Sequence, residues 1–212
     1  MIDRKPLLRG YLHLVAAFVA VAGLVVLALL AGSPREYVGG AVFATSLILL
    51  YSVSATYHVI TWGERARRWL KRLDHSMIFV LIAGSYTPFC LVLASDAWGF
   101  TILAIVWSIA AAGIALKVAW PDCPRWLGVS LYIATGWLSL AAGSEIIGTF
   151  GTVPLLMLAG GGALYSLGGV IYALQRPNPF PRVFGYHEVF HTLVIAASAV
   201  HYAVVAGYVM PA

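Results

Sequence analysis

Long apolar stretches divide the chain into seven segments, each bounded by charged residues or by proline and glycine. Each stretch is close to the roughly 20 residues that an α-helix needs to cross the hydrocarbon core of a bilayer. The expected membrane helices are 11–31, 37–61, 74–94, 97–118, 126–147, 152–174 and 187–209. Because these helices use nearly the whole chain, we predict an all-α membrane protein with one domain, residues 1–212, built as a seven-helix transmembrane bundle.

The composition excludes an ordinary soluble domain. Hydrophobic residues make up 61% of the chain and charged residues only 10%, whereas soluble domains carry about 25% charged residues. The first apolar run, residues 11–31, is longer than the core of a secretory signal, so we expect it to remain as a membrane helix. Cys90 and Cys123 fall in different parts of this topology and are expected to be free thiols.

The basic residues predict the orientation of the bundle. If the helices alternate in direction, all but one of the thirteen lysines and arginines fall on one side, and only Arg35 falls on the other. The positive-inside rule then places the N-terminus in the cytoplasm and the C-terminus outside it. The net charge of +5 is therefore explained by topology, and nucleic-acid binding is not expected.

Three histidines in the predicted spans suggest a metal centre. His187 and His191 are four residues apart, so both imidazoles lie on one face of a helix, about 6 Å apart. His58 lies near the same end of the bundle, at the end of the second predicted span. If His58 faces the other two, the set is three imidazoles and an open fourth position, which is typical of catalytic zinc.

Two further polar residues are candidates for catalysis at this site. Asp74 begins the third predicted span and could accept a proton from a water molecule at the metal, although a helix N-cap would also explain an aspartate there. Ser54 lies one turn before His58 and could orient an imidazole or a substrate oxygen. A serine in a membrane helix also commonly bonds the carbonyl one turn back, so Ser54 has a structural alternative.

The segment His187-Glu188-Val189-Phe190-His191 also matches the HExxH pattern of zinc proteases, in which the glutamate is the general base. Glu188 is rotated by about 100° from His187, which disfavours that role. His201 lies ten residues beyond His191, about 15 Å along the helix, too far to bind the same ion. We expect His201 to be a core or pocket residue, and His13 and His75 to be interfacial or to support the ligands.

The ordered motifs resemble the haemolysin III branch of the progestin and adiponectin receptor family. They are Arg9-Gly10-Tyr11-Leu12-His13, Ser54-Ala-Thr-Tyr-His58, Leu73-Asp74-His75-Ser76 and His187-Glu188-Val189-Phe190-His191. The resemblance implies a seven-helix bundle in a bacterial plasma (inner) membrane and a Zn²⁺ ion on His58, His187 and His191. It also implies that Asp74 approaches a water on that ion. Ceramidase-type lipid amidase activity has been attributed to the receptor branch.

The sequence therefore predicts a zinc-dependent hydrolase that acts on a lipid amide or ester, with a membrane lipid of the cytoplasmic leaflet as its substrate. A pore-forming cytolysin is the first alternative, because the family bears a haemolysin name. A water-filled pore needs polar residues along its length, and the outer halves of the predicted spans have almost none. The second alternative is a membrane-state sensor in which zinc is structural and no turnover occurs.

Overall fold

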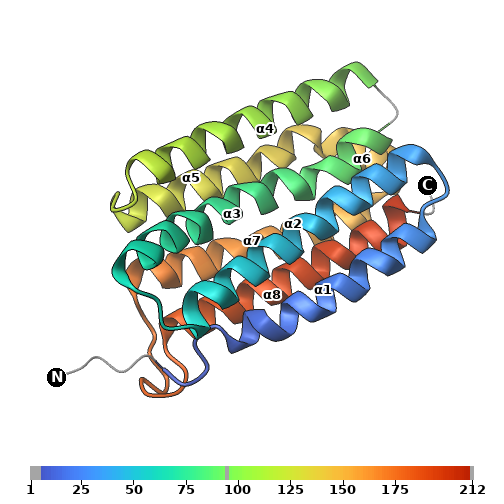
Figure 1. Ribbon diagram of the computed structural model, residues 1–212. Helices are drawn as coiled ribbons and strands as arrows, with labels where there is room; N and C mark the ends of the chain where they lie inside the picture. The colour runs from blue at the N-terminus through green and yellow to red at the C-terminus, as the bar shows by residue number, and fades with distance from the viewer. Residues whose placement is uncertain (1–5, 94–95, 211–212) are drawn as a thin grey trace.

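The computed structural model describes residues 6–93 and 96–210, and these form a bundle of long helices (Figure 1). Seven of its helical segments are long and apolar enough to span a membrane, as predicted. The α-helices are α1 (Tyr11–Leu30), α2 (Pro34–Val59), α3 (Glu64–Val92), α4 (Asp96–Ala119), α5 (Arg125–Trp137), α6 (Gly143–Phe150), α7 (Thr152–Leu174) and α8 (Tyr186–Val204), and a π-helical segment, Val205–Val209, continues α8.

The helices follow one another around the bundle in nearly sequential order. Helix α2 packs against α1 and α3, α3 packs against α4, and α7 packs against α5 and α8 (Figure 1). Contacts between α1 and α8 close the ring. As a result, the first and last spans lie side by side, and the start of α8 reaches the same end of the bundle as the end of α2 and the start of α3.

Helix α3 is longer than predicted. It begins at Glu64 instead of residue 74, because the basic segment before Asp74 is made of good helix formers. Hydropathy marks the part of a helix that can lie in hydrocarbon and says nothing about a charged extension beyond it. Asp74 therefore lies ten residues inside the helix, about 15 Å from its start, so the structure excludes the N-cap alternative.

The fifth span is interrupted, which the apolar pattern did not predict. Between α5 and α6 the chain forms a 3₁₀ turn over Leu138–Ala142. The Tyr86 hydroxyl lies 2.8 Å from the Thr135 carbonyl oxygen and 2.7 Å from the Gly136 carbonyl oxygen, next to this turn. A side chain of α3 thus satisfies backbone groups that a regular helix would pair internally, as membrane-embedded backbone requires.

Small residues on α7 allow close packing against α8. A Cβ atom added at Gly161 would lie 2.4 Å from the His201 ring, and one at Gly168 would lie 3.3 Å from Phe190 and Leu193. Glycine at these positions brings two membrane helices together, a common role for small residues in bilayers. Both cysteines are buried and free, as expected from their positions in the topology.

Candidate metal centre

The structure brings His58, His187 and His191 together in the interior of the bundle. His58 comes from the last turn of α2, and the other two come from the first turns of α8. All three side chains are buried, and one ligand atom from each lies within 4.8 Å of the others. His58 Nε2 and His187 Nε2 are 3.2 Å apart.

These distances suit a single metal ion. Two nitrogens bound to a tetrahedral zinc at 2.0–2.1 Å would be separated by about 3.3 Å, close to the 3.2 Å between His58 Nε2 and His187 Nε2. His191 Nδ1 is buried and has no hydrogen-bond partner among the described residues. An unsatisfied buried nitrogen is costly, and a metal ion is one partner that would satisfy it. The donor set therefore fits a metal with three imidazole ligands.

The two predicted catalytic residues border this cluster. Asp74 Oδ2 lies 3.7 Å from His58 Nε2, the same nitrogen that faces His187. Ser54 is buried one turn from His58 and lines the adjoining cavity. Its hydroxyl has no hydrogen-bond partner among the described residues, so the structure does not support the backbone-bonded alternative. A carboxylate and a hydroxyl thus lie beside the three imidazoles.

Two residues at the start of α1 pack against the clustered histidines. Gly10 packs on His58: its φ of +87° suits glycine, and an added Cβ would lie 2.8 Å from His58 Cβ. The His13 ring stacks on His191, with centroids 3.7 Å apart and planes 9° from parallel. The sequence predicted that His13 is interfacial or supports the ligands, and it assigned no role to Gly10. The one available signal was their occurrence together in the motif Arg9-Gly10-Tyr11-Leu12-His13.

Glu188 is fully buried and has a structural role. Its Oε1 forms an ion pair with Arg9, and its Oε2 accepts a hydrogen bond of 2.8 Å from the Gly185 N–H at the start of α8. Both carboxylate oxygens are therefore occupied away from the three imidazoles. The geometry does not favour the protease interpretation of the HExxH pattern, because that mechanism needs a free glutamate facing the metal.

We expect the variant Glu188→Ala to be destabilised, because it leaves the Arg9 guanidinium without its buried partner. Breaking a buried ion pair costs about 3–5 kcal/mol. Thermal unfolding in detergent would measure the loss. The control is Glu64→Ala, which removes an exposed carboxylate that pairs with Arg68 at 3.7 Å and should change stability by about 0–1 kcal/mol. Equal melting temperatures for wild type and Glu188→Ala would contradict this role.

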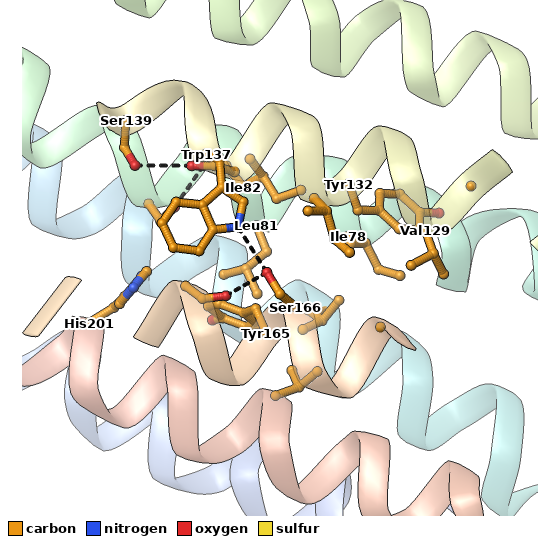
Figure 2. A pocket seen from close by; sticks show the side chains of 18 of the residues that line it. Ile78, Leu81, Ile82, Val129, Tyr132, Trp137, Ser139, Tyr165, Ser166 and His201 are labelled. Carbon is orange, nitrogen blue, oxygen red and sulfur yellow. Dashed lines mark hydrogen bonds between the residues drawn. The ribbon is translucent and has the colours of Figure 1, made fainter. Parts of the chain in front are cut away.

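A cavity of about 460 Å³ extends from the histidine cluster into the bundle. Figure 2 shows residues that line this cavity, among them Trp137, Tyr165, Ser166 and His201, which come from three helices. His201 lies far from the three clustered histidines, as predicted, with Nε2 3.2 Å from the Leu158 carbonyl oxygen. The volume lies within the range of about 300–1,000 Å³ that is typical of small-molecule sites.

Together, these features define a class: a multi-pass integral membrane protein with a buried three-histidine centre at one end and a cavity leading away from it. The family follows from sequence comparison. The model of the haemolysin-III related family matches residues 2–202. The chain belongs to this family, which confirms the prediction made from the motifs.

Bacterial and animal relatives match over most of their lengths. The hemolysin-3 homolog of Bacillus subtilis (strain 168) is 33% identical over 199 residues, covering 92% of this chain and 90% of the relative. Hemolysin-3 of Bacillus cereus is 30% identical over 213 residues, covering 98% of this chain and 93% of the relative. The human monocyte to macrophage differentiation factor is 24% identical over 196 residues, covering 91% of this chain and 79% of the relative.

Proposed function

We propose that this protein is a zinc-dependent membrane hydrolase that cleaves a lipid amide or ester at the histidine end of the bundle. The observation that carries the proposal is the buried cluster of His58, His187 and His191, which has a carboxylate beside it and borders a large cavity. A purely structural metal site would not need such a cavity. Soft and borderline metals suit three imidazoles, and zinc is the redox-inert member of that group.

Asp74 and Ser54 have separate roles in the proposed hydrolysis. When bound, zinc supplies Lewis acidity, which polarises a carbonyl and lowers the pKa of a water molecule. The Asp74 carboxylate takes the proton from the attacking water and can return it to the leaving nitrogen or oxygen as the amide C–N or ester C–O bond breaks. The Ser54 hydroxyl can hold the carbonyl oxygen or orient an imidazole.

The rest of the site positions these groups and holds the substrate. The stacked His13 ring and the contact between Gly10 and His58 restrict the ligand imidazoles, as outer-shell contacts do in metal enzymes. The cavity receives the acyl chain along walls that include Leu81, Ile82 and Val194. The basic end of the bundle faces the cytoplasm under the positive-inside rule, so the substrate enters from the cytoplasmic leaflet.

Hydrolysis by the purified protein in lipid nanodiscs tests this proposal directly. Fatty-acid release from labelled lipid amides and esters should stop after zinc chelation and return when zinc is added back. Stoichiometric zinc with no release from any lipid would contradict the hydrolase and favour the sensor alternative. Dye leakage from liposomes that persists after loss of the histidines would favour the pore. Untargeted lipid profiling of cells with wild type and with His191→Ala would identify the substrate.

A further inference from the structure

Two cations without carboxylate partners border the cavity beside the candidate metal centre. Lys117 is buried, with 5% of the residue exposed, and its Nζ lies 3.0 Å from Cys123 Sγ. A thiol is a weak hydrogen-bond acceptor. Arg125 is exposed at the start of α5 and also lines the cavity. Among the described residues, no aspartate or glutamate oxygen lies within ion-pair distance of either side chain.

Each cation contacts the ring of a tyrosine that also reaches a residue at or next to the candidate metal centre. Lys117 Nζ lies 5.6 Å from the centre of the Tyr132 ring, and the Tyr132 hydroxyl donates to the carbonyl of His75, the neighbour of Asp74. Figure 2 shows Tyr132 among the residues that line the cavity. The second path runs from α5 to α8: the Arg125 guanidinium lies 5.7 Å from the Tyr172 ring, whose centre is 5.6 Å from that of His187.

The other charged side chains that line the cavity are Lys71, Asp74 and Asp122. Lys71 Nζ pairs with Asp122 Oδ1 at 2.7 Å and lowers the pKa of the Asp122 carboxyl. Asp74 lies beside His58, where a metal cation would add positive charge. Lys117 and Arg125 therefore leave the cavity with uncompensated positive charge. A buried ammonium is costly in a low-dielectric region, and a bound anion would offset that cost.

We propose that the lipid taken by this site carries an anionic group, a carboxylate or a phosphate, at its polar end. Lys117 and Arg125 bind this group while the acyl chain lies in the cavity and the scissile bond lies at the histidines. Charge-assisted hydrogen bonds from two cations give the headgroup both affinity and position. This inference rests on the proposed hydrolase for the position of the scissile bond, but the binding preference can be measured without turnover.

The position of the Lys117 ammonium depends on Gly128. A Cβ atom at residue 128 would lie 2.5 Å from Lys117 Nζ. Alanine at this position would push the ammonium away without removing its charge. The variant Gly128→Ala therefore tests the location of the charge, and Lys117→Gln tests its presence.

Binding of matched lipids to the full chain in zwitterionic nanodiscs tests the inference. N-palmitoylglycine and N-palmitoylethanolamine share the chain and the amide and differ in the carboxylate. Lysophosphatidic acid and monoacylglycerol form the phosphate pair. We expect wild type to bind the anionic member of at least one pair about tenfold more tightly, since hydrogen bonds to charged groups are strong. Lys117→Gln should lose most of that preference and keep its affinity for the neutral member.

The control is Arg68→Gln. Arg68 is an exposed cation at the same end of the bundle, where it pairs with Glu64, so this variant should keep the preference for the anionic lipid. Gly128→Ala should reduce the preference even if Lys117→Gln does not fold. Equal wild-type affinity for both members of both pairs would overturn the inference, as would an equal loss in Arg68→Gln. Tighter binding of the anionic lipid without hydrolysis would support this inference and count against the proposed hydrolase. Hydrolysis with equal binding of both lipids would support the hydrolase and count against this inference.

Discussion

Replacing His191 with alanine is expected to remove bound zinc from the purified protein. His191 is one of the three described residues that can share a metal ion, and two remaining nitrogens cannot complete a stable zinc site. Loss of an outer-shell partner already lowers metal affinity by about 10–100-fold, so loss of a ligand should lower it further. Metal analysis of protein purified without added chelator should change from about one zinc per chain to nearly none.

His201→Ala is the matched control for this experiment. His201 lies on the same helix and lines the same cavity, but it contacts the Leu158 carbonyl instead of the other histidines. Its loss should leave the zinc content unchanged. Wild-type protein without stoichiometric metal would remove the basis of the proposed function, and equal zinc in wild type and His191→Ala would show that the ion lies elsewhere.

The second large effect is expected from Asp74→Asn. The amide preserves the shape of the side chain beside His58 but cannot accept a proton from water, and loss of a general base costs about 10²–10⁴-fold in rate. Zinc content should stay near the wild-type value, because Asp74 lies outside the group of atoms that can share one ion. Fatty-acid release from the lipid substrate and metal content should be measured on the same preparation.

Glu64→Gln is the control for Asp74→Asn, since it changes an exposed acid on the same helix, at the same end of the bundle. This control should keep full activity. A loss of zinc from Asp74→Asn as complete as that from His191→Ala would instead identify Asp74 as a metal ligand, which closes the fourth position and favours a structural metal. Full activity in Asp74→Asn would exclude it as the base.

Much of the fold could be predicted from the sequence because membrane spans follow from local composition. A run of about 20 apolar residues has one stable arrangement in hydrocarbon, a helix that satisfies its own backbone. The number of spans was therefore predicted correctly, and the range 152–174 coincides with α7. The start of α3 at Glu64 was missed because hydropathy does not register a charged helical extension. The break after Trp137 was missed because contacts with α3 help to support it.

The histidine cluster could also be predicted from the sequence, because it too depends on the helical spans. Helical periodicity places His187 and His191 on one face, and the alternation of spans brings His58 to the same end. The side chains that contact and position these histidines and their helix could not be predicted from the sequence. Arg9 and Glu188 are 179 residues apart and meet only because α1 packs beside α8.

The sequence by itself determined the number of spans, the family and the residues that can bind a metal, because these depend on composition, helical period and motif order. Only the tertiary structure decided that Glu188 pairs with Arg9, that His13 stacks on His191, and that Lys117 is buried without a carboxylate partner among the described residues. Such contacts depend on which faces of distant helices meet. That choice comes from packing across the whole bundle, and no local pattern encodes it.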